Sequence, residues 1–272
     1  MSAPLAINRQ PTPSDDAPSA RRRLVLGVPV DNVDMAHALV WIERSIAAAR
    51  AVGEGFVTRQ VVTLNPEIVM AARANPALCA AIATADLVLP DGAGVVWAAG
   101  LHARVTGIDL LEALAGLAAR RGYRLFLLGA APGVGTAAAD ALRARYPGLA
   151  IAGTEAGSPG PAERSALAAR IHATQADVVF VAFGAPAQEE WIAATRGALG
   201  AAVAVGVGGA LDFVAGRVPR APEWMRVRGL EWLFRLLRQP WRWRRMLALP
   251  RFAAAVVVSR RAASVGRWKR ED

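Results

Sequence analysis

The feature that most constrains the fold is a regular alternation of short apolar runs with longer helical patterns from residue 123 onward. Strand-like runs occupy 125–128, 150–154, 178–183 and 201–207, and helical patterns separate them. Parallel strands need a crossover connection that is usually a helix. The order therefore predicts an α/β fold with a mainly parallel, Rossmann-like sheet and helices on both faces.

Two switches from strand to helix occur earlier in the chain. The apolar run 61–62 leads to Thr63 and Asn65, and the run 87–89 leads to Asp91; a helical pattern follows each. Open α/β sheets bind ligands beyond the carboxyl ends of their strands, so we expect these polar side chains at a binding site. Apolar sequence flanks Asp91, and a partly desolvated cleft would raise its basicity. The competing interpretation is that Asp91 only caps the following helix.

Three further elements are predicted in the first half of the chain. Residues 24–30 are predicted to form one strand, and residues 34–50 and 110–121 to form helices. In the loop that precedes the helix 110–121, Arg104 and Asp109 either have a functional role or form a solvated ion pair.

A glycine-rich loop, residues 129–135, follows a predicted strand and precedes a helix. Gly129 and Gly133 could let backbone N–H groups approach a phosphate, or they could serve only a tight turn. The spacing is not G-x-G-x-x-G and no Gly-Lys-Ser/Thr follows, so neither a dinucleotide nor a P-loop is specified. Gln188 and Asp212 also follow predicted strands and are candidate substrate ligands.

Composition limits the remaining chemistry. His37, His102 and His172 are scattered, so no metal site is expected, and Cys79 alone permits no disulfide within the chain. The longest uncharged run is too short for a membrane span. Residues 1–23 are rich in Pro, Ser, Asp and Ala, and we expect a disordered arm there.

The C-terminal part differs from the rest. Residues 217–270 contain fifteen Arg or Lys against two acids, and five of the eight tryptophans lie between 219 and 268. Arg235, Arg242 and Arg245 recur at helical spacing with apolar residues between them, and Pro240 is expected to divide the pattern into two helices. A basic amphipathic segment of this kind suits an anionic membrane surface. The alternative is a helical cap with solvated Arg side chains.

Several of these stretches, taken in order over about residues 24–250, resemble the WecG/TagA/CpsF glycosyltransferase family (glycosyltransferase family 26). The matching stretches are TLNPE at 63–67, LPDGAGV at 89–95, RVTGID at 104–109, FGAPAQE at 183–189 with Trp191, GVGGALDF at 206–213, and RAP, GLEWLFRL and PWR at 220–222, 229–236 and 240–242.

The resemblance implies an inverting hexosyltransferase (EC 2.4.1-type) of cell-surface polysaccharide or exopolysaccharide biosynthesis. Its donor would be a UDP-sugar and its acceptor a polyprenyl-diphosphate-linked sugar. N-acetylmannosamine, its uronic acid and glucose are the donor sugars that the family suggests. No cofactor and no metal would be required, and the enzyme would be cytoplasmic and peripheral on the inner face of the membrane.

The resemblance also assigns roles to residues. The residue matching Asp91 is the general base, those matching Thr63, Asn65, Arg104 and Gln188 line the site, and those matching Arg235, Arg242 and Arg245 approach the lipid diphosphate. We add Asp109, Gly129, Gly133 and Asp212 as substrate-binding candidates because of their positions at strand ends. Residues 24–216 would form the catalytic domain, and residues 217–272 a membrane-associating helical appendage.

Two other classes remain open at this point. One is a nucleotide-sugar or NAD-dependent oxidoreductase, against which the missing dinucleotide fingerprint argues. The other is a non-catalytic basic module that binds membrane or nucleic acid. We expect no nucleic-acid partner, and the sequence leaves a homo-oligomer open.

Overall fold

A six-stranded, fully parallel sheet forms the centre of the molecule, in the order β4-β3-β8-β7-β5-β6. The computed structural model describes residues 22–240 and 243–268, with side chains described up to residue 261. The strands are β3 (Arg59–Leu64), β4 (Leu87–Pro90), β5 (Arg124–Gly129), β6 (Ala150–Glu155), β7 (Val178–Ala182) and β8 (Val203–Gly206). The predicted Rossmann-like α/β architecture is confirmed.

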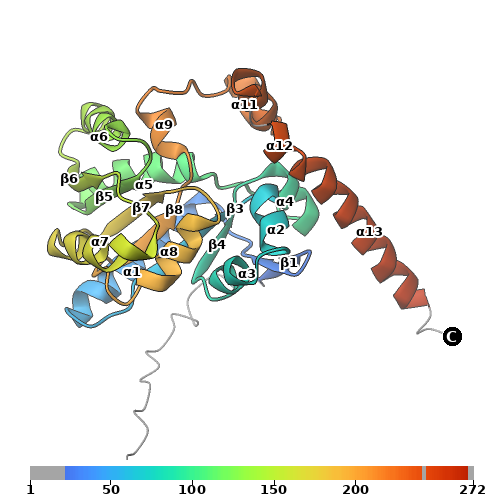
Figure 1. Ribbon diagram of the computed structural model, residues 1–272, viewed down its shortest axis with the longest axis horizontal. Coiled ribbons are helices and arrows are strands. Elements are labelled where there is room, and N and C mark those ends of the chain that lie inside the picture. The colour runs from blue at the N-terminus through green and yellow to red at the C-terminus, as the bar shows by residue number, and fades with distance from the viewer. Residues whose placement is uncertain (1–21, 241–242, 269–272) are drawn as a thin grey trace, which may run out of the picture.

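Helices cover both faces of this sheet (Figure 1). One layer contains α1 (Met35–Val52), α5 (Gly107–Arg121), α6 (Val134–Arg145) and α9 (Ala210–Val214). The other contains α2 (Pro66–Ala72), α3 (Pro76–Ala83), α7 (Pro161–Ala173) and α8 (Ala187–Thr195), and α4 (Ala93–Ala99) packs beside β4. Successive strand side chains point to opposite faces, so Val203 and Val205 pack in the first layer and Ala204 in the second.

The segment predicted as one strand, residues 24–30, is instead a hairpin. Strands β1 (Arg23–Val25) and β2 (Val28–Val30) pair antiparallel in a separate two-stranded sheet. Leu26 and Gly27 both have positive φ values, 53° and 87°, which is the backbone of a two-residue type I′ turn. Of the predicted N-terminal arm, residues 1–23, only Arg22 and Arg23 are among the described residues.

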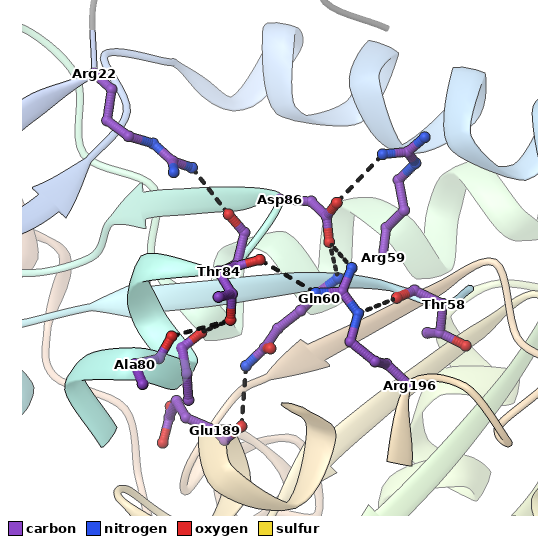
Figure 2. Close-up of polar contacts among 11 residues, drawn as sticks. Arg22, Thr58, Arg59, Gln60, Ala80, Thr84, Asp86, Glu189 and Arg196 are labelled. Carbon is purple, nitrogen blue, oxygen red and sulfur yellow. Dashed lines mark hydrogen bonds and ion pairs between the residues drawn. The ribbon is translucent and has the colours of Figure 1, made fainter. Parts of the chain in front are cut away.

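Polar contacts tie the strands together at the end of the sheet opposite to their carboxyl termini. Asp86, which precedes β4, accepts hydrogen bonds from the backbone N–H of Gln60 at 2.8 Å, from Arg59 at 3.3 Å and from Arg196 at 2.5 Å (Figure 2). Asp86 thereby joins β3, β4 and the end of α8. These contacts fix the amino-terminal ends of the strands, and the carboxyl-terminal ends remain available to form a ligand site.

The described residues of the C-terminal part include the helices α10 (Glu223–Val227), α11 (Glu231–Arg238), α12 (Trp243–Met246) and α13 (Ala248–Trp268). Helix α13 points away from the sheet in Figure 1, but its first turns pack against α2 and α4. Phe252 is 2% exposed and shares a core with Val69 and Val95. None of the helices that the structure describes is both long and apolar enough to cross a membrane.

Candidate active site

Two adjacent lobes of a cavity, which share lining residues, lie at the carboxyl ends of β3, β4, β7 and β8. One lobe has a volume of about 400 Å³ and a mainly apolar lining, and the other about 780 Å³ and a more polar lining. We call them the apolar lobe and the polar lobe. The residues that border both are Asn65, Glu67, Asp91, Val207, Gly209 and Arg235. The two lobes therefore meet at Asp91, as expected for a site that brings two ligands together.

Asp91 is held at this junction by backbone contacts. Its N–H donates to the carbonyl of Leu64 at 2.9 Å, and its Oδ2 accepts from the N–H of Gly107, the first residue of α5, at 3.3 Å. Helix α4 begins after Gly92 without a side-chain cap, so the Asp91 carboxylate does not cap α4. A Cβ on Gly92 would lie 2.5 Å from Cδ of Pro66, so only glycine lets α2 and α4 start this close together.

The environment of Asp91 changes its protonation. Burial raises the pKa of Asp91 to about 7, although the N–H of Gly107 and the nearby Arg104 act in the opposite direction. A carboxyl group with this pKa is divided between its two forms near neutral pH. It is therefore suited to accept a proton from a substrate hydroxyl.

The predicted residues Thr63, Asn65 and Gln188 border the polar lobe, where each also holds the backbone. The Thr63 hydroxyl donates to the carbonyl of Gly206 at 2.7 Å. Oδ1 of Asn65 accepts from the N–H of Ile68 at 3.0 Å and caps α2. Both contacts fix the backbone around the lobe. Thr63 and Asn65 therefore have a structural role and are also candidate ligands.

Cationic side chains from the C-terminal helices complete the polar lobe. Arg244, Arg245 and Arg251 line it together with Asp212, and Arg235 borders both lobes. Arg245 pairs with Glu67 at 3.1 Å. The Arg235 guanidinium lies 5.0 Å from the ring centre of Phe213, and burial lowers the pKa of Arg235. Its buried Nε has no hydrogen-bond partner within the part of the chain that the structure describes. Arg242 lies outside the described residues.

The C-terminal helices form part of the lining of the apolar lobe, and aromatic and aliphatic side chains from α4, α11, α12 and α13 face it. These include Trp97, Trp232, Phe234, Met246, Leu249 and Phe252. The sequence interpretation assigned this part of the chain to a membrane surface and missed its role as a wall. The available signal was the apolar stripe between the Arg residues of the C-terminal segment, since such a stripe can pack on the chain itself.

Arg104 fastens the C-terminal segment to the site. It pairs with Glu231, at the start of α11, at 3.1 Å and donates to the carbonyl of Arg226 at 2.9 Å, and its side chain lines the apolar lobe. The ion pair envisaged for Arg104 and Asp109 does not form between these two residues. Asp109 instead accepts from Thr106 at 2.6 Å and from Arg220 at 2.5 Å. Burial raises the pKa of Asp109, but these two hydrogen bonds together with the positive charges of Arg220 and Arg104 leave the pKa below its ordinary value.

The glycine-rich loop lies next to the polar lobe without lining either cavity. Gly129 has a φ of 95°, and a Cβ there would lie 2.7 Å from the carbonyl carbon of Ala182 at the end of β7. Gly133 precedes α6 with a φ of 80°. Asp109, Gly129 and Gly133 are therefore neighbours of the cavity, and the other described candidates border it.

No group of three or more His, Cys, Asp or Glu side chains within the described residues is arranged to hold a metal ion.

Comparisons with known proteins show the family of this chain. The model of the "Glycosyl transferase WecG/TagA/CpsF family" matches residues 23–265. An N-acetylglucosaminyldiphosphoundecaprenol N-acetyl-beta-D-mannosaminyltransferase of Bacillus spizizenii is 40% identical over 209 residues, covering 75% of this chain and 80% of the relative. A protein of the same name from Bacillus subtilis is 38% identical over 200 residues, covering 72% and 77%. The chain belongs to the WecG/TagA/CpsF glycosyltransferase family.

Proposed function

We propose that this enzyme transfers an N-acetylmannosamine-type sugar from a UDP-sugar to a polyprenyl-diphosphate-linked sugar, with inversion at the anomeric carbon. The observation that carries the proposal is Asp91, a carboxyl with a pKa of about 7 at the junction of two lobes of different polarity. The names of the two Bacillus relatives support the acceptor class and the N-acetylmannosamine donor. The uronic acid of this sugar and glucose are the competing donors.

The proposed reaction is a single displacement. The acceptor hydroxyl gives its proton to the Asp91 carboxylate as its oxygen attacks the anomeric carbon of the donor. The bond between that carbon and the β-phosphate oxygen breaks, and UDP leaves with the electron pair. Attack from the side opposite the leaving group inverts the configuration. The resemblance places Arg235 and Arg245 near the lipid diphosphate. We assign them instead to the donor diphosphate, because they line the polar lobe, and there they stabilise the charge that develops as UDP leaves.

The two lobes suit the two substrates. We place UDP in the polar lobe, where four arginines from the C-terminal helices and the loops after β7 and β8 line the cavity. We place the acceptor sugar in the apolar lobe, whose rim carries Arg104 and Arg220. This arrangement leaves Asp91 between the acceptor hydroxyl and the donor. It needs no metal, because arginine cations take the place that a divalent cation would hold beside the diphosphate.

The outer surface of the C-terminal helices supports peripheral binding to the inner face of the cytoplasmic membrane. Trp224, Leu237 and Trp243 are 55%, 70% and 53% exposed, and arginines lie among them. Exposed Trp and Leu beside cations suit the headgroup region of an anionic bilayer. A lipid-linked acceptor would then reach the apolar lobe from the membrane side. No observation in the structure favours the oxidoreductase or the nucleic-acid-binding alternative.

A donor screen tests this function. The purified full chain is given UDP-N-acetylmannosamine, its uronic acid form, UDP-glucose or a nicotinamide cofactor, together with a short-chain polyprenyl-diphosphate-N-acetylglucosamine acceptor and with EDTA present. We expect transfer from UDP-N-acetylmannosamine, with an inverted anomeric configuration in the NMR spectrum of the product. Transfer that requires a divalent cation, or a product of retained configuration, would contradict the mechanism.

A further inference from the structure

Glu189, on the first turn of α8, is a buried carboxyl behind the polar lobe that the proposed reaction does not use. It is 0% exposed. Its Oε1 accepts from Nε2 of Gln188 at 2.7 Å, and its Oε2 has no hydrogen-bond partner among the described residues. Burying a carboxyl oxygen without a hydrogen bond costs folding free energy, so this oxygen requires a structural or functional explanation.

The neighbouring Gln188 connects two loops of the polar lobe. Its Oε1 accepts from the N–H of Gly184, after β7, at 3.1 Å and from the N–H of Gly208, after β8, at 2.9 Å. If the amide group were turned by half a rotation, its NH₂ would face these two donors and both bonds would be lost. Because Glu189 accepts from Nε2, it favours the orientation in which Oε1 faces the loops.

The surrounding strands leave room for this arrangement and fix it. A Cβ on Gly206 of β8 would lie 2.8 Å from Nε2 of Gln188 and 3.1 Å from Oε1 of Glu189, so a side chain at this position would displace both groups. Gln60 of β3 donates its side-chain N–H to the backbone carbonyl of Glu189 at 3.0 Å (Figure 2). Glu189 is therefore placed by β3 and β8, at the base of the loops that border the polar lobe.

We propose that Glu189 is a positioning residue for the donor: its buried carboxyl oxygen orients the Gln188 amide and thereby holds the Gly184 and Gly208 loops in the shape that binds a nucleoside diphosphate. The inference rests on the proposed placement of UDP in the polar lobe. It assigns Glu189 no contact with the substrate.

The charge state of Glu189 makes the idea testable. Burial raises its pKa to about 7, against the effect of the Gln188 hydrogen bond, and the negative charge of Glu190 raises the pKa further. Gln60 from β3 and Gly206 from β8 face it without charge. The protonated form is present below about pH 7. Above that pH an unpaired charge lies under the loops, which favours opening of the loops to water and weakens donor binding.

The experiment measures UDP affinity of the full chain by calorimetry between about pH 6 and pH 9, for the wild type, Glu189→Gln and Glu189→Met. The Gln variant keeps an acceptor and carries no charge, so its affinity at pH 6 should stay within about threefold of wild type. Its advantage over the wild type should grow as the pH rises through about 7. The Met variant keeps the approximate volume but loses the acceptor, and should weaken UDP binding about tenfold or more. Glu190→Gln, in the same helix as Glu189, is the matched control: it replaces a carboxylate that accepts a hydrogen bond from Asn75 at the start of α3. Its affinity at pH 6 should stay close to wild type, because Glu189 is mainly protonated there with or without the charge of Glu190.

Two outcomes would overturn the proposal: equal UDP affinity in the Met variant and the wild type, or a ratio of Gln-variant to wild-type affinity that is constant over the pH range. Absence of UDP binding in every form would instead refute the donor site under Proposed function. In that case amide hydrogen exchange at Gly184 and Gly208 still tests Glu189. The Met variant should lose protection at both amides, and retained protection would contradict a positioning role.

Discussion

Replacing Asp91 with Asn should lower activity and raise stability, both for the same physical reason. The carboxyl sits where burial raises its pKa from an ordinary 3.8 to about 7, so its ionised form costs folding free energy. Each unit of pKa shift corresponds to about 1.4 kcal/mol, which gives an upper limit of about 4 kcal/mol. Because Asp91 borders an open cavity, we halve this figure to about 2 kcal/mol. For a chain of this length that is a rise of about 4–8 °C in Tm.

The sign of the pH dependence follows from the direction of the shift. A raised pKa means that the stability associated with the protonated carboxyl is fully present below about pH 4 and is lost as the pH rises through about 7. The asparagine side chain of the variant does not ionise, so the stability of the variant does not depend on pH through this position. The Tm difference between Asp91→Asn and wild type should therefore be near zero at about pH 4 and largest above pH 7. Loss of the base should lower kcat by about two to four orders of magnitude.

Asp109→Asn is the matched control, because the pKa of Asp109 lies below its ordinary value. Its ionised form stabilises the fold, so this variant should lower Tm near neutral pH, and the loss should fade in acid. Tm is followed by differential scanning calorimetry and kcat with the short-chain lipid acceptor. An Asp91→Asn variant with near-wild-type kcat would refute its role as base. A lower Tm than wild type at pH 8 would refute the claim that the buried charge is costly.

Three further predictions concern the surroundings of the site. Gly129→Ala should cost about 1–3 kcal/mol in denaturant unfolding, because the backbone is left-handed there and the new Cβ would overlap the backbone of β7. Phe252→Ala should cost about 3–5 kcal/mol, whereas Val258→Ala, at a 65% exposed position of the same helix, should be nearly neutral; equal losses would show that α13 does not share the core. The double variant Trp224→Ala and Trp243→Ala should sediment less with anionic vesicles and keep its affinity for UDP, and unchanged sedimentation would argue against interfacial binding through these side chains.

Local patterns in the sequence were sufficient for the class of fold and for part of the site. Side-chain alternation and helical spacing are properties of neighbouring residues, so the strands and helices between residues 123 and 207 could be predicted close to their observed bounds. The two helices expected on either side of Pro240 are instead divided into the shorter elements α10, α11 and α12 and the long α13. The position of Asp91 just past β4 followed in the same way, because all parallel strands place their carboxyl ends at one edge of the sheet. The hairpin at β1 and β2 was missed, since Leu26 is an unusual residue for a left-handed turn position.

Only the tertiary structure decided which of the candidates meet. The pairing of β3 with β4 brings Asn65 and Asp91 together, and α11 brings Arg235 to the same cavity, although 170 positions separate Asn65 from Arg235. It also decided what the polar side chains do. Asp109 holds Arg220 rather than the partner beside it in sequence. Phe252, in a segment with the composition of a membrane surface, is buried against α2 and α4. A sequence pattern states which face of a helix is apolar, but the free energy of burial depends on which surface that face meets, and that surface comes from a distant part of the chain.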